Sequence, residues 1–368
     1  MRKAVYHILI YILSLFALMG CDVHEFPVER NERVPYLLHL NFDTELYFHK
    51  EVIYTRNGED NTTKTAMERH DVRYVINAYR TDNVVGVNKV ADTTFVFTKS
   101  DLSELNYTVP LKLKEGSYRF AVWCDYVSAG SIEDKYYDTS DFVEVILKNK
   151  DKHPGNNEFR DVFKGHTTGT VINPAYYTGE ALNRIDNQTT VEMSRPVGKI
   201  QFISTDVEEF LTRIASIMQQ QGLFSTPLDK NGFNALLQSI DLSQFKVVIR
   251  YDMNMPCSYD MIYDKTSDSW TGMSFESNMV RINDTEMSLG FDYAFVDNLG
   301  TTLNMSVEVY NSKGELMSRS RSVQVPIMPS KLTTVRGEFL TSIATGGVSI
   351  NPGYEGDDYN WDITDVIQ

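Results

Sequence analysis

Hydrophobic and polar residues alternate along most of this chain, which is the pattern of half-buried β-strands. In residues 38–43, leucine and phenylalanine alternate with histidine, asparagine and aspartate. The same period of two recurs in residues 118–126, 245–251 and 303–309, and the last of these segments runs into a turn signal at 311–314. Many short strands separated by turns predict β-sandwiches rather than βαβ units.

One segment departs from this pattern and predicts a helix. Thr205 is followed three residues later by Glu208, which is the spacing of a capping box. Six apolar residues then fall on one helical face, namely Val207, Phe210, Leu211, Ile214, Ile217 and Met218. Gly222 supplies a stop signal, and a weaker helical pattern covers residues 233–240. We expect these helices to be an insertion between strands, packed on the edge of a sandwich.

The distribution of polar segments predicts two domains. Residues 148–192 are rich in Asn, Asp, Thr and Gly, and the domain boundary is expected near their end. The predicted fold is therefore mostly β, with two β-sandwich domains in tandem at 36–192 and 193–345 and the short helical insertion in the second. A polar tail covers 346–368. No strong internal repeat is evident along the chain.

The N-terminus carries a targeting signal. Arg2 and Lys3 precede an apolar run of about sixteen residues, which is shorter than the ~20 residues of a membrane-spanning helix. Residues 1–20 are therefore predicted to be a signal peptide. The ending Leu18-Met19-Gly20-Cys21 resembles the lipobox of bacterial lipoproteins, a resemblance that implies cleavage before Cys21 and its acylation. The alternative is an ordinary signal peptide with a chance cysteine. Residues 21–35, which contain two prolines, are expected to form a tether.

Charge and cysteine content exclude several classes of protein. The chain has 35 basic against 50 acidic residues, a formal net charge of −15, so we expect no nucleic-acid binding. Three cysteines do not make a disulfide scaffold or a zinc cluster. Beyond Cys21, Cys124 and Cys257 fall in different halves of the chain, which favours two buried thiols over a disulfide between them.

A search for catalytic or metal-binding patterns leads to the prediction that the chain is not an enzyme and carries no cofactor or metal. HExxH, GxSxG, a Walker A loop and GxGxxG are absent, and no histidine pair has metal-ligand spacing. His39 and His49 are expected to face solvent from strands. Asp358, Asn360 and Asp362 are spaced like the first ligands of a calcium loop, but Ile363 stands where glycine is required, so a solvated tail is favoured. A glycosidase would need two carboxylates held across a cleft, which the sequence does not indicate.

Aromatic residues leave a binding function open. Tyr136, Tyr137, Tyr176, Tyr177 and Trp270 would stack on sugar rings if they were exposed. Tyrosines in β-rich proteins more often pack in cross-strand pairs, and this interpretation is favoured here. A surface glycan-binding lipoprotein remains the alternative hypothesis, and an accessory domain of a glycoside hydrolase is a third.

Two short stretches carry a family resemblance. Residues 195–202 (RPVGKIQF) are expected to open the second domain, and residues 325–340 close it before a Gly346-Gly347 turn. With the lipobox and the strand layout, they resemble the fimbrillin-like lipoproteins of Bacteroidetes, which are minor components and anchors of type V pili. The resemblance implies two transthyretin-like β-sandwich domains, no catalytic activity, and a role in holding or capping a filament at the outer membrane.

The resemblance also implies partners and processing. Its subunits assemble by strand complementation, in which one chain adds a strand to the sheet of another, so the expected partners are pilin-like subunits. Polymerising subunits lose their first strand to an arginine-directed protease, and Arg30 and Arg33 would suit such a cut, although an ordinary polar tether is the simpler interpretation. An anchor stays uncut and keeps its lipid. The expected location is the outer membrane, lipid-anchored at the cell surface, although the acidic residues after Cys21 are more dispersed than surface export requires.

Overall fold

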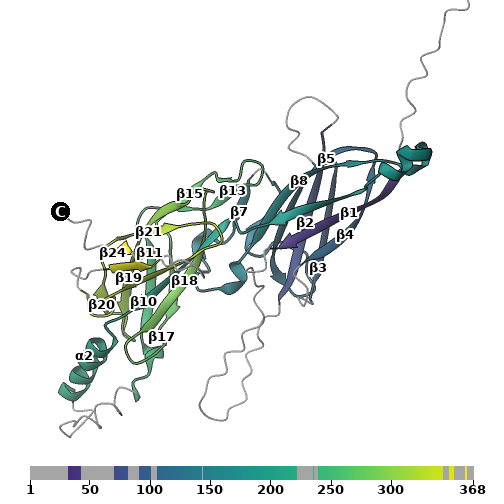
Figure 1. Cartoon of the computed structure of the whole chain (residues 1–368). Coiled ribbons are helices and arrows are strands. Elements are labelled where there is room, and N and C mark those ends of the chain that lie inside the picture. The colour runs from purple at the N-terminus through teal and green to yellow at the C-terminus, as the bar shows by residue number, and fades with distance from the viewer. Residues whose placement is uncertain are drawn as a thin grey trace, which may run out of the picture.

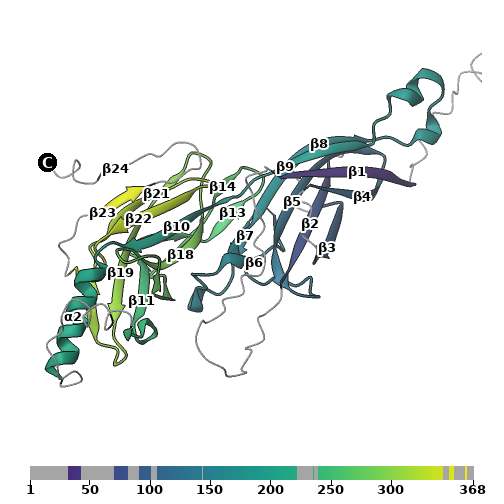
Figure 2. The same ribbon diagram turned by 60° about the horizontal axis from the view of Figure 1, so that its bottom comes forward.

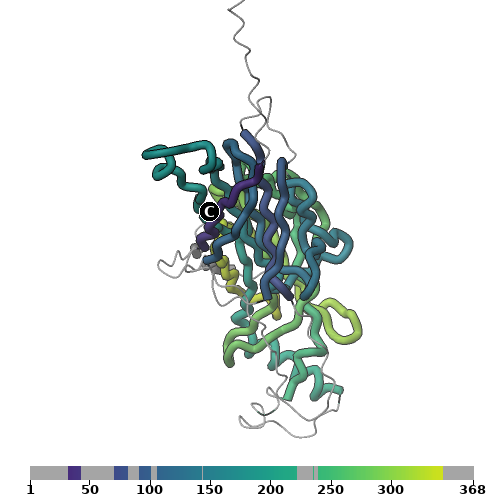
Figure 3. Tube along the Cα trace, turned by 90° about the vertical axis from the view of Figure 1, so that its right-hand side faces the viewer, coloured from purple at the N-terminus to yellow at the C-terminus, as the bar shows by residue number. Residues whose placement is uncertain are grey.

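The structure is a computed structural model, and it describes residues 32–42, 70–81, 91–100, 106–142, 144–221, 235 and 239–342, with the backbone of 348–351 and 361–362. The described chain is mostly β, as the alternating pattern predicted. Its strands form two stacks of sheets placed end to end, which we call the first and second sandwich (Figure 1). Figure 3 looks along this arrangement from the side of the first sandwich.

The first sandwich packs a three-stranded sheet against a four-stranded sheet. The smaller sheet has the order β4 (Tyr107–Lys114), β1 (Arg33–Phe42), β9 (Gln188–Met193), and the larger has the order β3 (Thr93–Lys99), β2 (His70–Arg80), β5 (Gly116–Ser128), β8 (Phe163–Val171). Alternate side chains of both sheets meet in one apolar core, which contains the whole inward face of β1. This arrangement follows from the period of two, because successive side chains of a strand point to opposite faces.

The second sandwich is larger. One sheet has the order β17 (Val280–Arg281), β18 (Met287–Phe295), β10 (Val197–Ser204), β22 (Leu332–Gly337), β23 (Val348–Asn351), β24 (Trp361–Asp362). The other has the order β16 (Ser274–Asn278), β11 (Lys246–Tyr251), β19 (Thr301–Tyr310), β20 (Leu316–Arg319), and β21 (Val323–Ile327) also pairs with β19. A separate pair joins β12 (Asn254–Pro256) to β15 (Ser269–Thr271).

The two sandwiches share a strand pattern that the sequence did not reveal. In the first, β1 lies between an antiparallel neighbour, β4, and a parallel neighbour, β9. In the second, β10 lies in the same way between antiparallel β18 and parallel β22. In both cases the opening strand sits inside its sheet and pairs in parallel with a strand much later in the chain. The repeat is therefore one of topology rather than of residues.

A segment of the first half crosses to the second. After β5 the chain forms β6 (Tyr137–Asp138) and β7 (Val145–Leu147), and these join β13 (Ser258–Asp260) and β14 (Lys265–Thr266) in a four-stranded sheet. Short 3-10 helices follow at Lys150–Lys152 and Glu158–Arg160, and others lie at Pro174–Tyr176, Gly179–Arg184 and Leu242–Gln244. As a result, the core of the second sandwich includes residues numbered well before the predicted boundary, such as Trp123 and Phe142.

A buried polar cluster connects the segment that follows β7 to the second sandwich. The Asp292 carboxylate on β18 lies 2.5 Å from Nε2 of His153, accepts a hydrogen bond of 2.6 Å from the Tyr251 hydroxyl and pairs with Arg160. Arg160 also donates to the carbonyl of Tyr293 at 2.9 Å. Burial raises the pKa of Asp292, but Arg160 and His153 outweigh it and bring that pKa down to about 2. The crossing segment is thus held to β18 by charge and to β13 by strand pairing.

The predicted helix is present, with a different start. Helix α2 (Val207–Gln220) follows β10 and packs Val207, Phe210, Leu211, Ile214 and Ala215 inward, whereas Ile217 is exposed. It lies at the end of the second sandwich that faces away from the first (Figure 2). The N-cap is Asp206 rather than Thr205, and it makes no side-chain cap. Its carboxylate instead accepts from the backbone N–H groups of Leu340 and Thr341 at 3.1 and 2.7 Å, so tertiary contacts replace the expected capping box. The weaker stretch at 233–240 lies largely outside the described residues.

Candidate functional site

The first strand of the chain lies in the middle of a sheet, and this position makes it the candidate site. β1 pairs with β4 over eight residues, from Arg33 opposite Lys114 to Leu40 opposite Tyr107. On its other side it pairs in parallel with β9 over six residues. The next strand in sequence, β2, belongs to the opposite sheet. β1 is therefore held entirely by strands that lie far from it in the chain.

The inward face of β1 is deeply buried. Five side chains at alternate positions, Val34, Tyr36, Leu38, Leu40 and Phe42, are between 0 and 7% exposed. The Tyr36 ring stacks on Phe120 with centroids 5.4 Å apart, and burial raises the pKa of the Tyr36 hydroxyl to about 12. A fully buried side chain of this size stabilises the fold by roughly 1.5–3 kcal/mol, so the five together contribute on the order of 10 kcal/mol.

The outward face of β1 is tied to both neighbouring strands. The ring nitrogens of His39 lie 2.8 Å from the Thr108 hydroxyl on β4 and 3.0 Å from the Gln188 amide oxygen on β9. Asn41 donates to the Glu192 carboxylate on β9 at 2.6 Å. His39 thus projects from the outer face of its strand, as predicted, and it bridges the two strands that hold β1. His49 lies outside the described residues.

The residues predicted for lipidation and processing are only partly described. Cys21 and Arg30 lie outside the described residues, and both remain predictions. Arg33 is the exposed first residue of β1, so the strand starts within the segment that was expected to be tether. The reason is that Val34 and Tyr36 continue the alternation of the strand and are buried in the core. A cut after Arg33 would leave all five buried side chains of β1 in the chain.

The far edge of the second sandwich is occupied by the C-terminal segment. β23 pairs antiparallel with β22, from Val348 opposite Gly337 to Asn351 opposite Thr334, and β24 pairs with β23. This segment was expected to be a polar tail, and its backbone here extends the sheet. Of the three residues considered for calcium, Asp358 and Asn360 lie outside the described residues.

The aromatic residues considered for glycan stacking do not form one surface. Tyr136 and Tyr137 are buried at 7 and 1% exposure, and Trp270 is partly buried. Tyr176 and Tyr177 are exposed, at 43 and 36%, on the turn between β8 and β9. The favoured interpretation, that most of these rings are packing residues, therefore holds for three of the five.

Metal ligands and cysteines are the remaining candidates from the sequence. No cluster of His, Cys, Asp or Glu there has the arrangement of a metal site. Cys124 and Cys257 are both free thiols and buried, as the sequence favoured. No helix among the described residues has the length and apolar character needed to cross a membrane.

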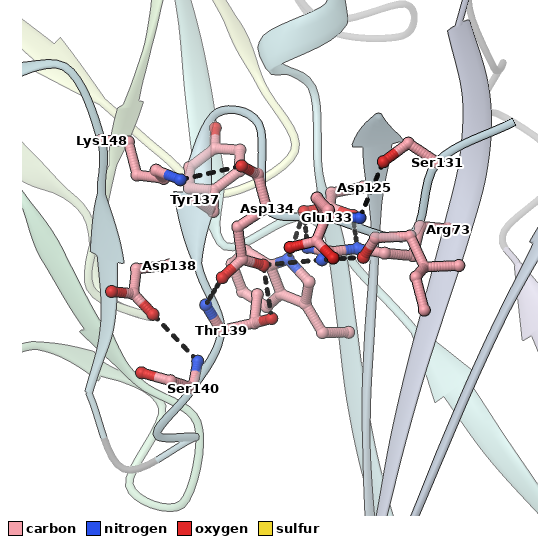
Figure 4. Close-up of polar contacts among 12 residues, drawn as sticks. Arg73, Asp125, Ser131, Glu133, Asp134, Tyr137, Asp138, Thr139, Ser140 and Lys148 are labelled. Atoms are coloured by element: carbon pink, nitrogen blue, oxygen red, sulfur yellow. Dashed lines mark hydrogen bonds and ion pairs between the residues drawn. The ribbon is translucent and has the colours of Figure 1, made fainter. Parts of the chain in front are cut away.

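Sequence reasoning missed a polar hollow on the outer face of the four-stranded sheet. It has a volume of about 320 Å³ and lies between β2, β3 and the loop after β5. At its floor Arg73 donates to Asp125 at 2.9 and 2.7 Å and to Asp134 at 2.6 Å (Figure 4). Burial raises the pKa of Asp125 even though Arg73 opposes the shift. Because these partners are 52 and 61 residues from Arg73, no local motif marks them.

Comparison with known proteins gives structural neighbours and a family. The fimbrial anchor protein Mfa2 from Porphyromonas gingivalis is 12% identical with a TM-score of 0.41, and the match covers 90% of this chain and 99% of that one. A fimbrial assembly protein from Parabacteroides distasonis is 12% identical with a TM-score of 0.39, covering 89% and 99%. Both of these neighbours are fimbrial proteins. No curated protein matches the sequence. The model of a family of unknown function, DUF6562, matches residues 30–367, and the chain therefore belongs to that family.

Proposed function

We propose that this chain is a non-enzymatic, lipid-anchored protein of the cell envelope that acts as a fimbrial anchor or minor pilus subunit. It is held to the outer membrane through an acylated Cys21 and contacts pilin-like subunits through the edges of its sheets. The lipobox ending at Cys21 and the two stretches at 195–202 and 325–340 support this proposal from the sequence.

The observation that carries the proposal is the position of β1 between β4 and β9, which we call its seat. A strand whose partners are all distant in sequence can be matched, bond for bond, by a strand from another chain. A replacement would need apolar side chains at the five alternate positions that β1 fills, because the core provides on the order of 10 kcal/mol for them. This arrangement supports a place for the chain among proteins that assemble by strand complementation, with β1 supplied here by the chain itself.

The filled seat favours the anchor over a processed subunit. Arg30 and Arg33 precede the buried part of β1, so cleavage at either residue removes only the tether and the lipid. The seat would stay closed after such a cut. We infer that the chain keeps β1 and uses its free sheet edges, rather than an emptied groove, to meet its partners.

Cell fractionation tests the proposed role. Filaments are sheared from intact source cells, the chain is quantified in the filament and membrane fractions, and its mature N-terminus is determined by mass spectrometry. We expect a chain that begins at acylated Cys21, remains with the membrane and crosslinks to pilin subunits. A chain absent from the filaments and from every pilin crosslink would refute the proposal, and glycan arrays would then test the alternative of glycan binding.

A disulfide across the β1–β4 pair tests whether β1 stays in place. His39 lies opposite Thr108, so the double variant H39C/T108C places two thiols on adjacent strands. We expect the oxidised double variant to be recovered with pilin subunits as well as the wild type, because an anchor keeps its first strand. The two single variants are the controls. Loss of recovery that returns on reduction would show that β1 must leave its seat.

A further inference from the structure

The edge strand β3 has no described partner on its outer side. It forms the end of the four-stranded sheet and pairs only with β2 among the strands that the structure describes. Residues 93–98 of this strand (TTFVFT) contain no charged residue and no proline, and the charged residue that ends it, Lys99, has its Nζ 3.8 Å from the centroid of the Tyr107 ring. Natural sheets usually protect an open edge with charge, proline or a bulge, because unpaired N–H and C=O groups accept a further strand. The composition of β3 instead favours strand addition.

The side chains of β3 divide between the core and the hollow described above. Phe95 and Phe97 pack against the core of the first sandwich, whereas Thr94 and Val96 line the hollow and Val96 is 40% exposed. The loop after β5 forms the opposite wall with Ile132 and Glu133. A strand added to β3 would therefore project alternate side chains toward the hollow, since successive side chains of a strand point to opposite faces.

The charge of the hollow selects the kind of side chain that would enter it. One guanidinium, that of Arg73, faces the carboxylates of Asp125 and Asp134, and the exposed Glu133 lies beside them. Negative charge is therefore in excess around Arg73. Lys148, just after β7, donates to the main-chain carbonyl of Asp134 at 2.8 Å and lowers the pKa of Asp138. With Lys148 and Asp138 included, the four carboxylates still outnumber the two cations. A basic side chain is the complement of such a site.

We propose that β3 accepts an extended strand from a partner protein, and that a lysine or arginine of that strand enters the hollow beside Glu133. Main-chain hydrogen bonds along β3 provide the affinity, and the hollow provides the specificity. This inference rests on the proposed function, and it names one sheet edge through which the chain would meet another subunit and the residue type that it would recognise there.

Peptide binding to the purified full chain tests the proposal. The probes are short fluorescein-labelled peptides of alternating threonine and valine with lysine, glutamine or glutamate at the centre, and binding is followed by fluorescence anisotropy. We expect the lysine peptide to bind best and the glutamate peptide to bind worst. Substitution V96K is expected to lower the affinity for the lysine peptide by about tenfold or more, because it adds a charge of the same sign as the peptide's lysine to the open edge. E133Q is expected to reduce the preference for lysine over glutamine roughly threefold.

Matched controls separate this effect from general damage. Val280 lies on β17, the edge strand of another sheet, and is 57% exposed, so V280K adds the same charge to an edge away from the hollow. Because Val96 is also partly exposed, V96K and V280K should both keep the wild-type melting temperature. Equal weakening by the two variants, or equal affinity for all three peptides, would overturn the proposal. Binding of an oligosaccharide that V96K abolishes, with no peptide bound, would also overturn it.

The result is independent of the fractionation experiment. A chain that crosslinks to pilin subunits but binds none of the peptides would refute the role of β3 and leave the proposed function standing. A chain that binds the lysine peptide in a Val96-dependent way but is absent from the filaments and from every pilin crosslink would refute the proposed function and support the role of β3.

Discussion

Two adjacent leucines of β1 test how this strand is seated. Leu38 is 0% exposed and belongs to the core of the first sandwich, whereas Leu37 points to the opposite face and is 40% exposed. Both belong to the same strand and pair with the same neighbours, β4 and β9. The substitutions L38A and L37A therefore remove the same atoms from the same backbone and differ only in which face of the sheet loses them.

The expected magnitudes differ several-fold. Replacing a fully buried leucine by alanine costs about 2–5 kcal/mol, through lost burial and the cavity that remains. For the partly exposed Leu37 we expect no more than about 1 kcal/mol. Since 1 kcal/mol shifts the melting temperature by roughly 2–4 °C in a unit of 150–250 residues, a loss of about 3 kcal/mol in L38A lowers it by roughly 6–12 °C.

Urea and thermal unfolding, followed by circular dichroism, measure the difference. The two variants should share the wild-type dependence on urea concentration and differ in their midpoints. Equal destabilisation by L37A and L38A, or a larger effect of L37A, would refute the reasoning. A strand shifted by one residue would exchange the buried and exposed faces and produce that reversal.

Three further predictions concern buried groups. The pKa of Asp292 is about 2 in the folded chain, below its unfolded value, so its contribution of roughly 2 kcal/mol should be present above about pH 4 and lost as the pH falls toward 2; acid unfolding curves should show this loss in the wild type but not in D292N. A Cβ added at Gly169 would lie 2.2 Å from the Tyr36 hydroxyl oxygen. G169A should therefore lower the unfolding midpoint, and adding Y36F to G169A should restore part of the loss. Additive effects of the two substitutions would contradict this contact. Burial raises the pKa of the Cys124 thiol and that of the Cys257 thiol, the latter to about 12. Neither thiol should therefore react with a disulfide reagent at pH 8 in the folded chain, and both should react in urea. Reaction in the folded state would show that the core opens.

The local pattern of residues was sufficient for much of the fold. The period of two predicted a mostly β chain, and strands cover the four alternating segments, with β1, β5, β11 and β19 in those places. The amphipathic run from Val207 predicted a helix in the second half, and α2 is that helix. These features depend on contacts between near neighbours in sequence and on which face of an element is apolar, both of which a single sequence displays.

Other features depended on partners distant in the chain. The true start of β1 at Arg33 depends on the burial of Val34 and Tyr36 in the core. The N-cap of α2 is Asp206 because Leu340 and Thr341 lie beside it in the fold. In each case a residue more than a hundred positions away, or a whole opposing sheet, decided the outcome.

The sequence by itself therefore determined the strand-rich class, the helix and the two buried, unpaired cysteines, because each follows from composition or short-range spacing. Only the tertiary structure decided that β1 lies inside its sheet, that the segment after β5 crosses to the second sandwich, and that Arg73 shares a hollow with the edge of β3. The physical reason is that strand pairing and buried ion pairs join residues that are far apart in the chain. The choice of partner depends on main-chain geometry and charge, and neither produces a periodic pattern in the sequence.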